Sequence, residues 1–194
     1  ALSGIVDSNP DVLDKFSEKF SGVKTFLQLD NALLEKDFQG FIVATPADTH
    51  YEIAKKIIEA EKHILVEKPL ALNVKDAEEL EKLANKNNVN LMVGHVLLFH
   101  PAITKIKELI SKEVIGKLQY IYSNRLNLGQ VRTQENVFWS LAPHDISIFQ
   151  YFIDSFPEEI KAQGSSFLQK GINDSTITQL KYPNGVEGHI FVSW

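Results

Sequence analysis

The stretch Ile64-Leu65-Val66-Glu67-Lys68-Pro69-Leu70 decides the fold that this sequence predicts. It is a short apolar run that ends at an acid, a base and a proline, a pattern typical of a buried parallel strand whose carboxyl end opens into a cleft. Because Pro69 donates no ladder hydrogen bond and has a fixed φ, strand pairing should end here and Lys68 should be held at the lip of the cleft. The alternative is that Glu67 and Lys68 are two solvated charges at a strand end.

Strand and helix patterns alternate around this stretch. Besides it, we expect strands over residues 2–7, 24–26, 40–44 and 91–94, and helices over 10–20, 32–36, a segment after Thr49, and 73–86. Asp30, Thr49 and Asn73 are the expected N-caps of the last three helices. This alternation predicts βαβ units and an α/β, Rossmann-type parallel sheet. Such a half normally opens with a strand and a Gly-rich turn, and neither precedes the first expected strand, so we interpret both as missing.

The pattern changes near residue 97, which predicts a second domain. We expect helices over 101–110 and 138–152, and strands over 117–128, 159–168, 175–182 and 186–194. The last two strands flank Asn184-Gly185, which is a strong hairpin signal. The predicted organisation is a dinucleotide-binding domain over 1–96, incomplete at its N-terminus, and an α+β domain with a mainly antiparallel open sheet over 97–194, incomplete at its C-terminus.

Composition excludes several classes of protein. The 194 residues carry a net charge of −5, which argues against a nucleic-acid or anionic-membrane partner. No apolar run approaches ~18 residues, so we expect no membrane span and a cytoplasmic protein. The absence of cysteine excludes disulfides and thiolate chemistry, and the six histidines lack HExxH spacing, so we expect no metal site.

Side chains at the expected strand ends suggest a dinucleotide site. Asp7 would accept hydrogen bonds from the adenosine ribose and repel a 2′-phosphate, which favours NAD over NADP, although Asp7 could also be a helix-proximal acid. Thr45 and Pro46 end the next inward strand, where a cofactor would cross. For His50 the pattern favours a partly exposed surface histidine over a cofactor contact. The predicted cofactor-binding residues are Asp7, Thr45, Pro46, His50, Glu67 and Lys68.

A second informative segment is the helix pattern over residues 136–146. Ser140 and His144 lie one helical turn apart and share a face, whereas Asp145 points about 100° away. A histidine can take the proton of a hydroxyl near neutral pH, as oxidation of an alcohol by hydride transfer requires. The alternative is a core histidine whose hydrogen bonds are made by backbone.

The two arginines of the chain, Arg125 and Arg132, both precede that helix. Guanidinium groups match phosphates and carboxylates, so their clustering favours an anionic substrate, with surface salt bridges as the alternative. The predicted substrate-binding residues are Arg125, Asn127, Arg132, Ser140 and Asp145.

Three segments carry a family resemblance: Glu67-Lys68-Pro69, Ala44-Thr45-Pro46 with His50, and Pro143-His144-Asp145. Together they resemble the Gfo/Idh/MocA family of NAD(P)-dependent sugar oxidoreductases. The resemblance implies that Lys68 lies beside the nicotinamide and holds the reacting hydroxyl, and that His144 is the catalytic acid/base. Many relatives carry an aspartate one helical turn before that histidine. This chain has Ser140 there, so a Lys-Asp-His triad does not follow.

The segments 125–129 and 139–145 more closely resemble a subgroup that acts on nucleotide sugars, the UDP-N-acetylglucosamine or -glucuronate 3-dehydrogenases. That resemblance implies an NAD-dependent dehydrogenase with a sugar or nucleotide-sugar substrate, and we expect a homo-oligomer formed through the C-terminal sheet. The alternative hypothesis is a non-catalytic NAD- or sugar-binding regulatory protein of the same fold, which Ser140 supports.

Overall fold

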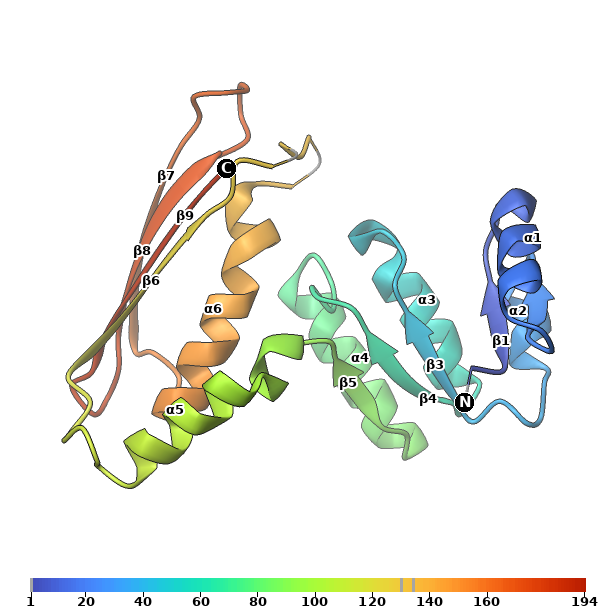
Figure 1. Ribbon diagram of the computed structural model, residues 1–194, viewed down its shortest axis with the longest axis horizontal. Helices are drawn as coiled ribbons and strands as arrows, with labels where there is room; N and C mark the ends of the chain where they lie inside the picture. Colours follow the sequence, from blue (N-terminus) through green and yellow to red (C-terminus); the bar gives the residue numbers. More distant parts are fainter. Residues whose placement is uncertain (1, 130, 134) are drawn as a thin grey trace. The chain divides into compact units, whose positions relative to one another are not determined.

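The computed structural model describes residues 2–129, 131–133 and 135–194 and divides into two compact units, Ala1–Gly94 and His95–Trp194. Figure 1 shows the helices and strands of both units, coloured in chain order. Among the described residues, no helix is both long enough and apolar enough to span a bilayer.

The first unit alternates strands and helices (Figure 1). Its strands are β1 (Gly4–Val6), β2 (Lys24–Phe26), β3 (Gly40–Val43), β4 (His63–Val66) and β5 (Leu91–Val93). Its helices are α1 (Pro10–Lys19), α2 (Leu29–Leu33), the 3-10 helix η1 (Ala47–Thr49), α3 (His50–Glu59) and α4 (Val74–Asn87). Strand β1 pairs with β2, β3 with β4 and β4 with β5, all in parallel. The predicted Rossmann-type α/β unit is therefore confirmed.

These strands form two sheets, β1-β2 and β3-β4-β5. A doubly wound nucleotide-binding sheet has the strand order 3-2-1-4-5-6. The pair β2-β1 corresponds to strands 3-2 of that order, and β3-β4-β5 to strands 4-5-6. Strand 1 belongs between β1 and β3, where the described residues place no strand.

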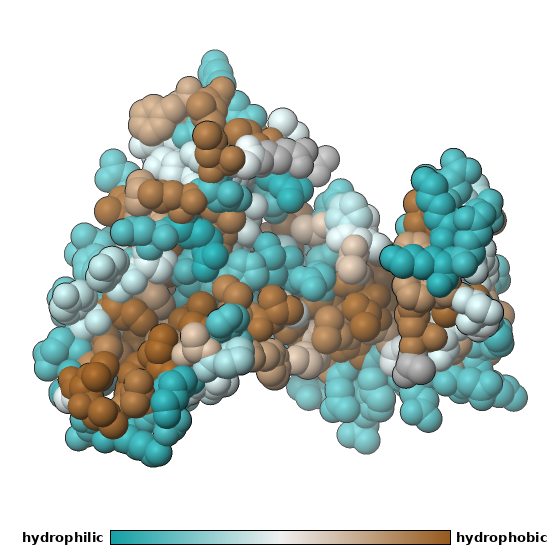
Figure 2. Space-filling model, in the orientation of Figure 1, coloured by the Kyte–Doolittle hydropathy of each residue, from teal (hydrophilic) through white to brown (hydrophobic). Residues whose placement is uncertain are grey.

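Helices α3 and α4 form the core of the first unit with the three-stranded sheet. The buried core residues are Val43, Ala54, Ile57, Ile58, Ile64, Val66, Leu80 and Ala84. Helix α1 buries only Leu13, and Figure 2 shows its surface as hydrophilic. Burying the apolar faces of α3 and α4 fixes the sheet, whose carboxyl edge then holds the candidate site.

Helix boundaries in this unit test the predicted caps. Asn73 accepts a hydrogen bond from the Asp76 N–H, which confirms it as the N-cap of α4. The prediction that Asp30 caps α2 is wrong, because α2 begins at Leu29 and Asp30 lies in its first turn. Thr49 precedes α3 but its side chain makes no capping hydrogen bond, so the predicted capping box is also wrong.

The second unit is a four-stranded mixed sheet with helices. Its elements are η2 (Val96–Phe99), α5 (Pro101–Ser111), β6 (Tyr120–Leu126), α6 (Val137–Ile153), β7 (Glu159–Ser165), β8 (Ser175–Lys181) and β9 (Glu187–Ser193), and the sheet order is β6-β9-β8-β7 (Figure 1). The pairs β7–β8 and β8–β9 are antiparallel, and Gly185, at φ +80°, completes the predicted hairpin turn. The parallel pair β6–β9 was not predicted.

Helix α6 packs on one face of this sheet. The buried residues that join them are Val137, Ala142, Phe149, Ile153, Leu180, Tyr182, Val186, Ile190 and Val192. The other face carries exposed side chains, including Tyr120, Tyr122 and Ile177. The open sheet predicted for this domain is confirmed, with α6 on its covered face.

Candidate functional site

Lys68 lies at the carboxyl edge of the three-stranded sheet. The Glu67 N–H donates to the Val43 carbonyl at 2.9 Å, and the Gly94 N–H donates to the Val66 carbonyl at 2.8 Å. These are the last backbone hydrogen bonds that join β4 to β3 and β5, so the chain leaves the sheet at Lys68. Lys68 is half-buried, at the place expected from the sequence.

The Glu67 carboxylate lies against Gly94. A Cβ on Gly94 would be 3.2 Å from Glu67 Oε1 and 3.3 Å from Oε2, closer than ordinary van der Waals contact. Glycine at position 94 therefore leaves the room that this carboxylate occupies. The sequence analysis did not identify Gly94 as a site residue, although a glycine at the end of an expected strand was the available signal.

His50 is the best anchored of the predicted site residues. It is 1% exposed, and its Nδ1 lies 2.7 Å from the Pro69 carbonyl oxygen while its Nε2 lies 2.8 Å from the Thr45 carbonyl oxygen. The favoured prediction of a partly exposed surface histidine is wrong, because α3 turns its first residue inward between the ends of β3 and β4. Direct contact between His50 and a cofactor stays untested.

Thr45 and Pro46 follow β3 at the same edge. Thr49 Oγ1 lies 2.7 Å from both Thr45 Oγ1 and the Pro46 carbonyl oxygen. The Thr49 hydroxyl is thus used to close the turn that carries Thr45 and Pro46, which is why it does not cap α3. Both residues are exposed, as a cofactor contact requires.

Asp7 directly follows β1, at the carboxyl end of that strand. Its N–H donates to the Phe26 carbonyl at 3.1 Å, and its Oδ1 accepts from the Asn9 N–H at 2.8 Å. Among the described residues no hydrogen bond to Oδ2 is present, so this half-buried carboxylate can still accept from a ribose hydroxyl. The residues at the ends of β1, β3 and β4 thus fit a dinucleotide, since parallel strands present their carboxyl ends at one edge.

His144 belongs to α6 in the second unit. Asn136 caps α6 by accepting from the Trp139 N–H at 3.1 Å, and the Val137 N–H donates to the Asn173 carbonyl at 2.9 Å. The N-terminal end of α6 is thereby fixed two turns before His144. Ser140 and His144 are both half-buried and one helical turn apart, as predicted.

Arg125 and Asp145 form a bidentate ion pair. Arg125 Nε donates to Asp145 Oδ2 at 2.8 Å, and Arg125 Nη2 donates to Asp145 Oδ1 at 2.9 Å. Asp145 is 4% exposed, and its hydrogen bonds raise the pKa of Arg125 against the opposing effect of burial. The pair ties β6 to α6 beside His144. Both residues were predicted to bind substrate. In the structure, the Nε and Nη2 groups of Arg125 instead donate to the carboxylate of Asp145.

The other two predicted substrate residues lie on the connection between β6 and α6. Asn127 is exposed and its N–H donates to the Ser193 carbonyl at 3.0 Å. Arg132 is exposed, and its carbonyl oxygen accepts from Gln169 Nε2. The structure therefore separates the roles of the two arginines, with Arg125 paired inside the unit and Arg132 at its surface.

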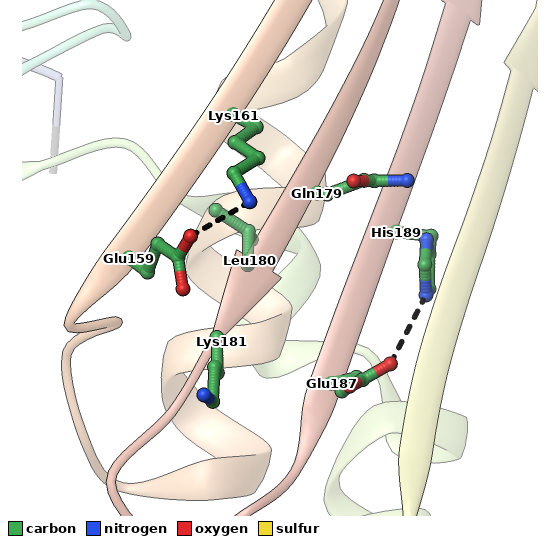
Figure 3. A pocket seen from close by; sticks show the side chains of 7 residues that line it. All are labelled: Glu159, Lys161, Gln179, Leu180, Lys181, Glu187 and His189. Carbon is green, nitrogen blue, oxygen red and sulfur yellow. Dashed lines mark ion pairs between the residues drawn. The ribbon is translucent and has the colours of Figure 1, made fainter.

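A polar hollow of about 300 Å³ lies on the open face of the second sheet, and Figure 3 shows the side chains that line it. It is lined by Glu159, Lys161, Gln179, Leu180, Lys181, Glu187 and His189. Lys161 pairs with Glu159 at 2.8 Å, and most of the side chains that line the hollow are charged or polar. His144 and Asp145 lie on α6, which packs on the other face. In the described part of the chain, no group of three or more His, Cys, Asp or Glu side chains could hold a metal ion.

Comparison with known proteins places both units. Residues 1–95 match the family model "Oxidoreductase family, NAD-binding Rossmann fold", and residues 103–194 match "GFO/IDH/MocA C-terminal domain". A myo-inositol 2-dehydrogenase of Thermotoga maritima is 25% identical over 199 residues, which cover 97% of this chain and 60% of that protein. A UDP-N-acetylglucosamine 3-dehydrogenase of Acidithiobacillus ferrooxidans is 26% identical over 164 residues, which cover 84% of this chain and 50% of that protein.

The fold is also that of solved structures. The crystal structure of a probable dehydrogenase from Thermotoga maritima matches with a TM-score of 0.90 at 25% identity, over 100% of this chain and 62% of that one. The chain thus spans little more than half the length of the relatives it matches. Because the two family models together cover nearly every residue, the chain belongs to the Gfo/Idh/MocA oxidoreductase family, with an NAD-binding Rossmann unit followed by the family's C-terminal domain.

Proposed function

We propose that this chain acts in an NAD-dependent dehydrogenase that oxidises a ring hydroxyl of a sugar or nucleotide sugar. The observation that carries the proposal is the position of Lys68, half-buried at the carboxyl edge of a parallel sheet and directly followed by a backbone carbonyl that His50 holds. In sheets of this type, ligands bind outside the carboxyl ends of the strands. A lysine there can contact a bound substrate.

The residues at this edge would hold NAD. Asp7 would accept the hydrogen bonds of the adenosine ribose, and its charge would oppose a 2′-phosphate, which favours NAD over NADP. The exposed Thr45 and Pro46 would lie along the cofactor, with Glu67 nearer the nicotinamide. When bound, NAD supplies the hydride acceptor for oxidation of the substrate carbon.

Two side chains of the chain would handle the substrate hydroxyl. His144 takes its proton, since an unperturbed imidazole changes charge near neutral pH. By the family resemblance, the Lys68 ammonium would donate to a hydroxyl oxygen of the substrate and stabilise negative charge that develops on it, an effect of about 3 kcal/mol for one well-placed donor. Ser140, one turn before His144, adds no charge where many relatives have an aspartate.

The substrate class rests on the connection between β6 and α6. Arg132 and Asn127 are exposed there and suit a phosphate or carboxylate. A UDP-N-acetylglucosamine 3-dehydrogenase among the relatives favours a nucleotide sugar. The myo-inositol 2-dehydrogenase favours an uncharged polyol instead. To separate these substrates, turnover of UDP-sugars is compared with turnover of inositols, both in the wild-type protein and in Arg132→Ala.

The test of the proposal is Lys68→Ala, followed by NADH absorbance. We expect kcat to fall by about 10²–10³-fold, the loss typical of one such donor, and the Kd of NAD to change less than about twofold. Lys62→Ala is the matched control, because Lys62 lies at the other end of β4, where its Nζ donates to the Glu35 carbonyl at 3.3 Å. Unchanged turnover in Lys68→Ala would remove this lysine from the mechanism.

A second function is supported by Ser140. A non-catalytic NAD- or sugar-binding regulatory protein of the same fold would not require an acid at that position. A change in nicotinamide fluorescence when NADH is mixed with the protein, with no NADH formed from NAD on any sugar or nucleotide sugar, would favour this function. Turnover by the wild-type protein would exclude it.

We also infer that the open face of the second sheet pairs with another copy of the chain. Tyr120 and Tyr122 are 63% and 64% exposed, and their rings stack with centroids 6.4 Å apart. Aromatic residues enriched on an exposed sheet face are typical of interfaces. Tyr122→Asp should therefore shift the size-exclusion volume of an oligomer toward the monomer. Val74→Asp, on an exposed position of α4, should not.

A further inference from the structure

We propose that His50 is a positioning residue for Lys68, and that its two ring N–H groups fix the backbone on both sides of the turn that carries the lysine. The inference deepens the proposed function, because the effect on turnover rests on the catalytic role of Lys68. Its structural part concerns only contacts within the first unit.

The first step is the pair of hydrogen bonds. His50 Nδ1 is 2.7 Å from the Pro69 carbonyl oxygen, and His50 Nε2 is 2.8 Å from the Thr45 carbonyl oxygen. A carbonyl oxygen only accepts, whereas a neutral imidazole donates from one nitrogen and accepts at the other. Both short contacts are therefore satisfied only when both ring nitrogens carry a hydrogen. The geometry requires an imidazolium that donates twice.

The second step is the environment of the ring. His50 is 1% exposed, so water cannot replace either carbonyl as a partner. It is also the first residue of α3, where the positive end of the helix dipole opposes a cation. The two carbonyl oxygens, which are both negative ends of dipoles, offset that repulsion. Charge-assisted hydrogen bonds of this kind are stronger and more directional than neutral ones.

The third step is what the two hydrogen bonds connect. Thr45 follows the end of β3, and Pro69 directly follows Lys68 after the end of β4. The imidazolium thus bridges the exits of two adjacent strands. It holds the carbonyl of Pro69, the residue that follows Lys68. This contact fixes the backbone of the turn and therefore the direction in which the Lys68 side chain leaves it.

The expected consequence is a loss of turnover that persists at saturating NAD. A misplacement of about 1 Å at a catalytic group costs on the order of 10²-fold in rate. We expect His50→Gln, whose single amide group replaces two donors on opposite sides of a ring, to lower kcat by about 10²-fold. Turnover is compared at saturating NAD, because His50 also holds the carbonyl of Thr45, a predicted cofactor contact.

The chain offers a matched control. His63 lies at the opposite end of β4, is exposed, and accepts a hydrogen bond from the Asn90 N–H at 3.0 Å through Nδ1. His63→Gln makes the same substitution at the first residue of β4, the strand that precedes Lys68, but away from its carboxyl edge. It should leave kcat unchanged, so a comparable loss in both variants would overturn the positioning role.

Two spectroscopic readouts do not depend on activity. In the wild-type protein, ¹⁵N spectra of the histidine side chains should show hydrogens on both ring nitrogens of His50, assigned by His50→Gln. A single protonated nitrogen would overturn the proposal. In protein with ¹³C-labelled lysine, His50→Gln should shift the Lys68 signal, assigned by Lys68→Arg. The signal of Lys55, on the same helix and paired with Glu79 at 2.8 Å, should stay unchanged.

The outcomes separate the two proposals. If the wild-type protein oxidises no sugar but both spectroscopic results are as expected, the proposed function fails and the positioning contact stands. If turnover is present and the Lys68 signal does not move in His50→Gln, the positioning role is overturned and the dehydrogenase stands. Both readouts require only that His50→Gln folds, which its thermal unfolding curve checks.

Discussion

Removal of the Asp145 carboxylate should destabilise the second unit strongly. In Asp145→Ala, the Arg125 guanidinium loses two hydrogen bonds of 2.8 and 2.9 Å and keeps its charge in a site where its side chain is 31% exposed. Breaking a fully buried ion pair costs about 3–5 kcal/mol. Because water still reaches part of Arg125, we expect a loss of about 2–4 kcal/mol in the free energy of unfolding.

The assay can be restricted to the unit concerned. The two tryptophans of the chain, Trp139 and Trp194, both lie in the second unit. Urea denaturation followed by tryptophan fluorescence therefore reports on this unit, independently of the first. The control is Lys112→Ala, which removes a pair with Glu108 whose side chains are 65% and 41% exposed. That surface pair should contribute only about 0.3–0.5 kcal/mol.

A double-mutant cycle tests the reasoning directly. The cycle compares Arg125→Met, Asp145→Ala and the double variant that combines them. The double variant removes both charges, so no uncompensated charge remains, and we expect it to be more stable than Asp145→Ala. A loss below about 0.5 kcal/mol in Asp145→Ala, or strictly additive effects in the cycle, would refute the view that this pair ties β6 to α6.

Three further predictions concern packing. Gly94→Ala places a methyl group 3.2 Å from Glu67 Oε1. We therefore expect the affinity for NAD, measured by fluorescence titration, to fall about tenfold, which corresponds to ~1.4 kcal/mol. In the control Gly40→Ala the nearest atom to the new methyl group would be 3.5 Å away, so this variant should bind NAD with normal affinity. The Thr178 hydroxyl is buried with no hydrogen-bond partner among the described residues, so Thr178→Val should raise the unfolding free energy, followed by tryptophan fluorescence, by about 1 kcal/mol. Leu80→Ala empties a fully buried site in the first unit and should cost about 2–5 kcal/mol by circular dichroism, and a loss below 1 kcal/mol would contradict the core assignment.

Short sequence patterns predicted the helix starts, turns and strand ends that depend on a few adjacent residues. Asn73 marked the start of α4, and Asn184 with Gly185 marked the turn between β8 and β9, because caps and tight turns depend on a few adjacent residues. The apolar run before Lys68 predicted the position of that lysine at a strand end, because a buried strand and a following proline leave few alternatives.

Contacts between distant segments were not predictable from the same patterns. His50 was expected near the surface, because its burial depends on the carbonyl of Pro69 in a later turn. Arg125 and Asp145 were each expected to bind substrate, because nothing in the sequence shows that they face one another across β6 and α6. The parallel pairing of β6 with β9 also joins segments separated by α6 and two other strands.

That pairing has a kinetic consequence. Strand β9 lies between β6 and β8 in the sheet. Strand β6, which begins at Tyr120, therefore has no strand to pair with until residues 187–193 have been synthesised. Contacts of such large sequence separation form slowly, because the intervening chain must be ordered before they stabilise it. The first unit, built from βα repeats with nearer partners, can therefore fold while the ribosome is still translating the second, whose sheet closes in a late step.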